Sequence, residues 1–397
     1  MEVAGIFRDH RHLLGPLHKE AAKVVRDIID CRTRKLGGHV KQCSDCGEEE
    51  IAYNSCRNRH CPKCQFLARA EWVEARIEEL LPVQYFHVVF TLPHELNALI
   101  LQNKKAIYGL LFAASAQTLK EVTEKRIQGE VGFISVLHTW DQKLLHHPHV
   151  HMIVPGGGLK VDAEGKDQWA SSRQGFLAPV AILSKVFRGK FLSGLDALHG
   201  QLTFAGSIEN LKDLRRFKKL LQRVARKSWV VYAKPPFAGP EQVIKYLGNY
   251  THRVAISNYR ILKVQDGHVT FRYRDSANAN QHRVMTVSVQ EFMRRFLLHV
   301  IPKRFVRIRH YGLLGNRNRK LKIERLKNLL LPSPPESKTE NILHKEKPDW
   351  KQRLKELGGV DVTVCPKCKV GRMVEVRVIE SFYDRRRRTK PKWWDTS

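Results

Sequence analysis

Hydrophobic positions along this chain follow two different periods. Apolar residues recur at helical spacing in several long segments, which lie at 10–30, 66–82, 94–126, 180–198 and 207–228. Short runs rich in β-branched and aromatic residues predict strands, which lie at 85–93, 132–140, 148–155, 228–237, 253–264 and 268–274. A further helix is expected from about residue 239, because Pro240 suits a first helical turn. Helices mixed with a few antiparallel strands are typical of an α+β fold.

The net charge narrows the class of partner. Lys and Arg number 70 against 39 Asp and Glu, which gives a net charge of +31. Such an excess of basic residues is unusual for an enzyme that acts on small molecules. It suits a protein that displaces counterions from the phosphate backbone of a nucleic acid. The N-terminal stretch has no apolar signal core, and no window approaches about 18 apolar residues in a row. We therefore expect a cytoplasmic protein without a membrane span, associated with the nucleoid through DNA.

The stretch "HHPHVHMIVPGGG" (146–158) leads from four histidines into an apolar strand. His149 and His151 flank Val150, so on a strand both imidazoles project from one face while Val150 points to the other. Two imidazoles side by side at the head of a buried strand indicate metal ligands. A histidine-rich surface cluster or hairpin is the alternative.

The eight cysteines fall into two clusters, six between residues 31 and 64 and two at 365 and 368. "CSDC" and "CPKC" in the first cluster are fourteen residues apart, and together they can close one tetrahedral zinc site. The predicted zinc ligands are Cys43, Cys46, Cys61 and Cys64. Disulfides are the alternative, which a chain without a signal peptide disfavours.

Other residues of this region allow a second zinc site. Cys31 and His39 precede the first Cys-x-x-Cys pair, and Cys56 and His60 precede the second, an order that suits two interleaved zinc ions. The alternative, that these four are core and loop residues, stays open. Cys365 and Cys368 supply only two zinc ligands, and the sequence does not indicate which residues would complete a site with them.

Basic residues between the predicted zinc ligands are suited to DNA. Arg57 and Arg59, on either side of Asn58, are well placed to contact phosphates if this module touches DNA.

Two tyrosines lie in the helix predicted after Pro240, which reads "EQVIKYLGNYTHRVAISN". Tyr246 and Tyr250 are four residues apart, so they share one helical face. Two core-packing tyrosines are the alternative, but Lys245, His252 and Arg253 crowd the same region and suit a phosphate. A tyrosine hydroxyl has a high pKa and needs help as a nucleophile, which a metal with open coordination positions can supply. Its attack on DNA would give a phosphotyrosine link and a free 3′ hydroxyl.

These motifs together resemble a known family. "HPHVH" with its apolar strand resembles the histidine-hydrophobe-histidine motif of HUH endonucleases, "VVFTLP" their first strand motif, and "YLGNYTHR" their two-tyrosine helix. With "CRTRKLGGHVKQC", "YNSCRNRHCPKCQ" and "VLHTWDQ", the order over residues 10–315 resembles the insertion sequence ninety-one family of rolling-circle transposases. The resemblance implies an HUH domain with a central antiparallel sheet of ferredoxin or RRM type, flanked by helices, plus an N-terminal zinc-binding module.

The resemblance also implies roles for single residues. Tyr246 and Tyr250 would be the nucleophiles, with Arg253 at a position where related helices often carry Lys. His149 and His151 would bind Mg²⁺ or Mn²⁺, and a neighbouring strand would supply the third ligand. His138 is the first candidate for that ligand, with Asp141 and Gln142 as alternatives, and His147 is less favoured because it lies in the turn. The substrate would be single-stranded DNA at transposon ends and at the target.

Four regions follow from this interpretation. They are a helical zinc-binding domain (1–82), an HUH two-tyrosine domain (83–315), a helix and linker (316–348), and a CxxC segment with a basic tail (349–397). The tail arginines expected to contact phosphate are Arg385, Arg386, Arg387 and Arg388. An HUH relaxase or replication initiator, or a non-catalytic zinc-dependent DNA-binding protein, are the alternatives. The zinc module and the lack of a P-loop favour a transposase over the first, and the intact histidines and tyrosines argue against the second.

Overall fold

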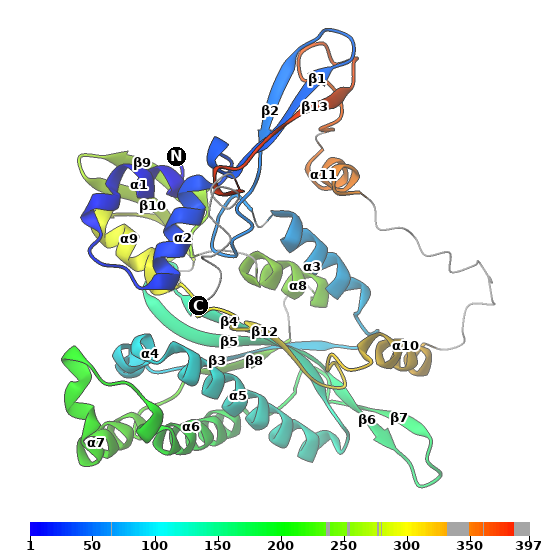
Figure 1. Cartoon of the computed structure of the whole chain (residues 1–397). Coiled ribbons are helices and arrows are strands. Elements are labelled where there is room, and N and C mark those ends of the chain that lie inside the picture. The colour runs from blue at the N-terminus through cyan, green and yellow to red at the C-terminus, as the bar shows by residue number, and fades with distance from the viewer. Residues whose placement is uncertain are drawn as a thin grey trace, which may run out of the picture. The chain divides into compact units, whose positions relative to one another are not determined.

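The computed structural model describes most of the chain and divides it into two compact units (Figure 1). The described residues are 1–64, 66–235, 239–251, 255–275, 278, 280–331, 349–359 and 361–384, without the side chains of residues 246 and 249–251. One unit comprises Met1–Glu71, His252–Val300 and Lys338–Ser397, and the other comprises Trp72–Thr251 and Ile301–Ser337. Neither unit is continuous in sequence. The four continuous regions expected from the sequence therefore differ from these two units, because each unit combines segments that lie far apart in the sequence.

The unit that contains Trp72–Thr251 is built on a five-stranded antiparallel sheet, ordered β12–β4–β5–β3–β8. Its strands are β3 (Tyr85–Thr91), β4 (Gly132–Trp140), β5 (His146–Pro155), β8 (Val231–Lys234) and β12 (Ile308–Gly312). Four of them lie where the hydrophobic pattern predicts strands, and the expected α+β class with an antiparallel sheet is confirmed. The fifth, β12, is not among the predicted strands, since "IRHYG" lacks the apolar alternation of a strand. A hairpin of β6 (Gly157–Val161) and β7 (Asp167–Ser171) follows β5.

Successive side chains of β3 and β5 face opposite sides of the sheet, so each strand contributes to two layers. Phe86, Val88 and Phe90, with Val150 and Met152, face the main core of this unit. Four helices cover that face: α4 (Asn97–Gln102), α5 (Lys104–Ile127), α6 (Val180–Ala197) and α7 (Leu214–Ala225). The opposite face is covered by α8 (Gly239–Thr251), by α3 (Phe66–Glu78) from Trp72 on, and by α10 (Arg319–Leu330).

The helix expected at 94–126 is interrupted. Asn103 separates α4 from α5 with a non-helical ψ of 36°. Its side-chain amide donates to the carbonyl oxygens of Leu99 (3.1 Å) and Thr203 (2.8 Å), and its Oδ1 accepts from the Thr203 amide (2.7 Å). The Asn103 side chain therefore ties the break between α4 and α5 to the backbone of Thr203, a role that local periodicity does not reveal. The helices expected at 10–30 and 207–228 are likewise shorter, as α2 (Lys19–Asp30) and α7.

The other unit joins the N-terminal residues to two separate sheets. α1 (Val3–His10) packs on α9 (Val289–Leu298), with the rings of Phe7 and Phe296 5.4 Å apart. α9 covers the sheet β11–β10–β9, made of β9 (Ile261–Gln265), β10 (His268–Asp275) and β11 (Gln281–Ser288). The second sheet, β13–β1–β2, consists of β1 (Gly38–Cys43), β2 (Glu49–Tyr53) and β13 (Met373–Ile379), and α11 (Trp350–Gly358) precedes β13 in sequence. A strand from residues 373–379 thus completes a sheet that begins at residue 38. Over the described residues, no helix has the length and apolar character needed to cross a bilayer.

Candidate metal centres and the tyrosine helix

Three histidines from two neighbouring strands converge on one face of the five-stranded sheet. In β4 and β5, His138 lies directly opposite His149, and His151 is two residues further along. One ring nitrogen from each of the three lies within 4.8 Å of the others. His138 and His151 are buried and His149 is half-buried. The structure therefore brings His138, the first candidate for the third ligand, together with His149 and His151.

Among the described residues, two of the alternatives for the third ligand, Asp141 and His147, do not join the group of three histidines. The Asp141 carboxylate accepts from the amides of Lys143 (2.9 Å) and Leu145 (2.7 Å), so it closes the turn between β4 and β5. Gln142 stays an alternative for the third ligand.

Hydrogen bonds orient the rings. His149 Nδ1 lies 2.6 Å from the carbonyl oxygen of His147, and since a carbonyl only accepts, Nδ1 carries the proton and Nε2 is the nitrogen left able to bind a metal. His151 Nδ1 lies 2.8 Å from Nε2 of His87 on β3, and the two rings stack with centroids 5.0 Å apart. Metal-binding histidines are usually held in this way by a hydrogen bond to the second ring nitrogen. His87 is not among the residues predicted from the sequence, although the alternation of β3 places it on the same face as the three histidines.

The surroundings keep these imidazoles neutral. Burial lowers the pKa of His149 to about 3 and that of His87 to about 4. Burial, and then the neighbouring histidines, lower the pKa values of His138 and His151 well below the usual value. A neutral imidazole offers a nitrogen lone pair, so the group can bind a divalent cation near neutral pH.

Helix α8 packs on the same face of the sheet as the three histidines. Val243, Ile244 and Leu247 form a buried cluster with Tyr85 of β3 and Ile153 of β5. Ile153 is two residues beyond His151, so both side chains leave the same face of β5.

Gly248 brings α8 close to α3. A Cβ atom on residue 248 would lie 2.1 Å from Cγ2 of Val73. The sequence "YLGNY" therefore carries glycine where two helices meet closely.

Three predicted site positions lie within α8. Tyr246 and Tyr250 belong to its helical backbone, and their side chains lie outside the described part. Lys245 is exposed, with its Nζ 3.7 Å from a Glu241 carboxylate oxygen. His252 and Arg253 lie outside the described residues.

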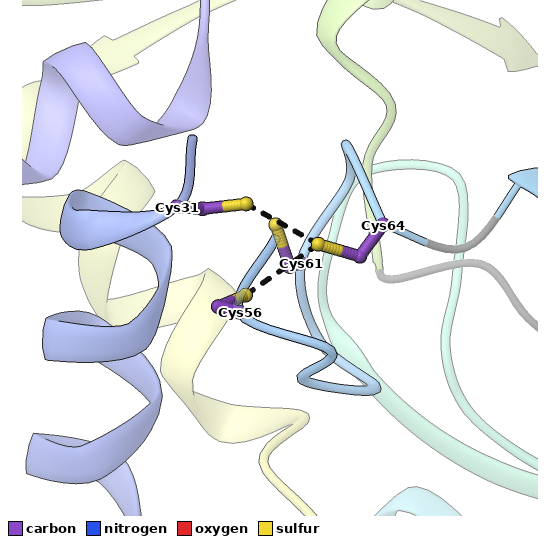
Figure 2. Close-up of side chains that lie close together, drawn as sticks. All are labelled: Cys31, Cys56, Cys61 and Cys64. Carbon is purple, nitrogen blue, oxygen red and sulfur yellow. Dashed lines mark hydrogen bonds between the residues drawn. The ribbon is translucent and has the colours of Figure 1, made fainter. Parts of the chain in front are cut away.

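The cysteines form two groups of four, and the predicted single site is wrong in its pairing. Cys61 and Cys64 meet Cys31 and Cys56, as Figure 2 shows. The Sγ atoms of Cys31 and Cys64 are 3.2 Å apart, and those of Cys56 and Cys64 are 3.6 Å apart. Cys31 ends α2, and the other three lie in the loop after β2. Contacts with the Cys31 thiol, and then with Cys56, lower the pKa of Cys64, which favours a thiolate there.

Cys43 and Cys46 instead meet Cys365 and Cys368. The Cys43–Cys368 and Cys46–Cys365 sulfur pairs are each 3.7 Å apart. The pairing follows from the sheet, because β1 ends at Cys43 against the first residue of β13, Met373. Spacing in the sequence does not identify partners for Cys365 and Cys368, because these partners lie more than 300 residues away.

The two histidines proposed for a second zinc site have other neighbours. His39 Nδ1 lies 2.7 Å from the Glu375 carboxylate across the sheet. His60 is buried, with its amide bonded to Asn58 Oδ1 at 2.9 Å. Neither joins a cysteine group, so the expectation of mixed Cys and His ligands is wrong for both.

The predicted DNA-contacting arginines differ in exposure. Arg57 is exposed, with a left-handed backbone (φ 51°). Arg59 is half-buried, and burial lowers its pKa. Asn58 between them donates to Asp27 of α2 at 2.7 Å, which holds the loop. The tail residues 385–388 lie outside the described part of the chain.

Comparisons with known proteins give one consistent result. Residues 5–92 match a family model described as "Transposase zinc-binding domain", and residues 132–322 match one described as "Putative transposase". "Putative transposase y4qJ" of Sinorhizobium fredii is 45% identical over 407 residues, covering 100% of this chain and 98% of the relative. "Transposase for insertion sequence element IS801" of Pseudomonas savastanoi pv. phaseolicola is 27% identical over 316 residues, covering 77% of this chain and 73% of the relative. No solved structure matches the chain.

Proposed function

Because the chain belongs to the insertion sequence ninety-one family of transposases, we propose that it cuts and rejoins single-stranded DNA at the ends of its element in a rolling-circle reaction. In this proposal residues 72–251 and 301–337 act as an HUH endonuclease, and Tyr246 and Tyr250 of α8 are the nucleophiles. The observation that carries the proposal is the shared sheet face: α8 packs on the face from which His138, His149 and His151 project.

The covalent step exchanges one phosphate ester for another. A tyrosine hydroxyl oxygen attacks the phosphorus, the bond from phosphorus to the 3′ oxygen breaks, and the phenolic proton is transferred overall to that oxygen. The products are a 5′-phosphotyrosine and a free 3′ hydroxyl. The reverse attack by another 3′ hydroxyl rejoins the strand, and two tyrosines allow two such exchanges in succession.

The histidine group fits a divalent cation. Its three ring nitrogens come from rigid, paired strands, and their low pKa values keep them neutral at the pH of the reaction. Mg²⁺ or Mn²⁺ bound there would polarise the scissile phosphodiester and stabilise the charge that develops on it. His87 acts as a positioning residue, because it contacts Nδ1 of His151.

The N-terminal region supplies a structural zinc site and basic side chains. Cys31, Cys56, Cys61 and Cys64 fall within the residues matched by the zinc-binding family model, and we assign the zinc to them. A zinc ion there would fix the loop that carries the exposed Arg57. Arg57, Lys245 and the tail arginines would contact phosphate, in keeping with the charge of +31.

The test is formation of a covalent protein–DNA adduct. The full chain is incubated with Mg²⁺ or Mn²⁺ and labelled single-stranded DNA from an end of its element, then separated on a denaturing gel. Each single variant, Tyr246→Phe or Tyr250→Phe, should keep part of the adduct but fail complete strand transfer. The double variant should form none, because Phe keeps the ring and loses the hydroxyl.

Controls separate chemistry from binding and folding. Tyr259→Phe removes a hydroxyl from an exposed tyrosine outside α8 and should leave the adduct unchanged. His149→Ala with His151→Ala should abolish the adduct while DNA binding persists. A strong adduct from the double tyrosine variant would place the nucleophile elsewhere, with Tyr232 the next residue to test. Equal reaction on duplex DNA would refute the preference for single strands.

A further inference from the structure

We infer that Cys43, Cys46, Cys365 and Cys368 bind a second structural zinc ion, which clamps the C-terminal strand of the chain onto its N-terminal hairpin. All four belong to one compact unit. Two of them lie outside residues 5–92, the part of the chain that the zinc-binding family model matches. The site is therefore distinct from that of Cys31, Cys56, Cys61 and Cys64.

The distances between the sulfur atoms fit a metal and not a disulfide. Zinc–sulfur bonds of about 2.3 Å in a tetrahedron place neighbouring sulfurs about 3.8 Å apart. The Cys43–Cys368 and Cys46–Cys365 pairs are both at 3.7 Å, and all four sulfurs lie within 4.8 Å of one another. A disulfide needs a separation of about 2.0 Å.

The two Cys-x-x-Cys loops have matching backbones. The Gly47 amide donates to the Cys43 carbonyl (3.3 Å), and the Lys369 amide donates to the Cys365 carbonyl (3.1 Å). Gly47 and Lys369, each directly after the second cysteine, have left-handed φ values of 71° and 62°.

Backbone amides also donate to the sulfurs of this group. The amide of Asp45 lies 3.4 Å from Cys43 Sγ, and the amide of Gly371 lies 3.3 Å from Cys368 Sγ. Such donors stabilise thiolates, the form of cysteine that binds zinc.

Close packing holds the two loops against each other. A Cβ atom on residue 371 would lie 2.4 Å from Cys43 Sγ, so only glycine fits beside that sulfur. The Ser44 amide donates to the Arg372 carbonyl (2.9 Å), and the Arg372 amide donates to Ser44 Oγ (3.0 Å). These contacts place the second loop independently of a metal, so the four thiols are preorganised.

The zinc ion would close a very long loop of chain. The paired cysteines are 325 and 319 residues apart in sequence. The register of β1 with β13, from Gly38–Ile379 to Cys43–Met373, brings them together. A cross-link over so long a loop restricts the unfolded chain strongly.

The clamp also anchors the start of the basic tail. Beyond β13, the Tyr383 hydroxyl donates to the buried carboxylate of Asp30, which also pairs with Lys35 at 3.1 Å. The arginines at 385–388 thus follow a segment fixed to the zinc-binding unit. Loss of the second zinc should weaken the attachment of that segment, which these hydrogen bonds still hold in part, without removing the first zinc.

Differential alkylation of the full chain tests the pairing directly. Isotope-labelled iodoacetamide is applied at increasing chelator concentration, and each cysteine is quantified by mass spectrometry. We expect two sets of four cysteines. The members of a set should become reactive at the same chelator concentration, and Cys43 and Cys46 should belong to the same set as Cys365 and Cys368. Reaction of Cys43 and Cys46 together with Cys61 and Cys64 would overturn the inference. So would full reactivity of Cys365 and Cys368 before chelator is added.

Metal content gives a second readout. In a His149→Ala, His151→Ala background, where the histidine group takes up no zinc, the chain should hold two zinc ions, one for each cysteine group. Adding Cys365→Ser and Cys368→Ser should leave one, and should make Cys43 and Cys46 reactive. Continued protection of Cys31 and Cys61 in this variant would show that the unit is still folded. Lys367→Ala, which changes an exposed non-ligand in the same loop, should keep both ions.

A conservative variant covers the case in which the serine variant unfolds. Cys368→His keeps a ligand at the position, so it should hold two metal ions. Its Co²⁺ form should lose part of the thiolate charge-transfer absorption. A single zinc ion in the starting protein, or a Co²⁺ spectrum unchanged by Cys368→His, would refute the second site. None of these readouts depends on DNA cleavage, so failure here is distinct from failure of the proposed function.

Discussion

Gly248 lies between the two tyrosines of α8, and the structure explains it by packing. Replacement by Ala would put a Cβ atom 2.1 Å from Cγ2 of Val73, against about 3.5–4.0 Å for an ordinary carbon contact. Overpacking of this kind costs about 1–3 kcal/mol. The higher helix propensity of Ala offsets about 1 kcal/mol of that cost. We therefore expect Gly248→Ala to loosen α8 from α3 by roughly 1 kcal/mol.

A second substitution should restore the packing of α8 on α3 that Gly248→Ala disturbs. The next atoms near the added Cβ are Val73 Cβ at 3.6 Å and Trp72 Cε3 at 3.7 Å, both ordinary contacts, so the clash involves one methyl group. Val73→Ala removes that methyl. The double variant should be more stable than the sum of the single effects, by about 1–2 kcal/mol in a double-mutant cycle.

Hydrogen–deuterium exchange of residues 239–251 measures this effect locally. A loss of about 1 kcal/mol corresponds to roughly fivefold faster exchange of protected amides. Gly109→Ala is the matched control, because residue 109 lies within α5 and an added Cβ would meet nothing within 4 Å. It should slow exchange in α5 slightly. Slower exchange in α8 after Gly248→Ala, or no repair by Val73→Ala, would refute the packing explanation. Adduct formation should fall and recover in parallel with the packing.

Three further expectations concern charge, pH and a buried hydrogen bond. Deletion of residues 385–397 removes four arginines and two lysines, so the log–log salt slope of single-stranded DNA binding should become shallower by up to about 4 units. Adduct yield at saturating DNA should persist, and its loss would show a role beyond electrostatic binding. Since the pKa of His149 is lowered from 6.5 to about 3, the unfolded chain binds more protons below pH 6.5. The Tm of the metal-free protein should therefore fall as the pH drops from 7 to 5, and a flat or rising Tm would contradict the burial of these rings. Tyr108→Phe removes a buried hydroxyl that lies 3.0 Å from His146 Nε2, so it should lower the free energy of unfolding by about 1 kcal/mol. Urea unfolding measures this change, and an unchanged free energy would mean that another hydrogen bond replaces the lost one.

Local patterns in the sequence were enough for the elements of the candidate site. The period-two alternation around His149 and His151 predicts that both rings leave one face of a strand, and the register of β5 agrees. The placement of His138 followed from a neighbouring strand joined by a short turn. The Cys-x-x-Cys spacing likewise identified pairs of thiols. These inferences hold because each depends on residues close together in the chain.

Tertiary structure alone decided which elements meet. A Cys-x-x-Cys loop supplies two ligands and accepts any other such loop as its partner, so spacing favoured the nearest one. The register of β1 with β13 pairs the first loop with one more than 300 residues away. Cys31, directly after α2, lies instead beside the loop of Cys61 and Cys64. In the same way, His87 joins the histidine group through the pairing of β3 with β5. Strand pairing and helix docking are long-range choices, made by the packing of whole surfaces and not by the residues beside each ligand.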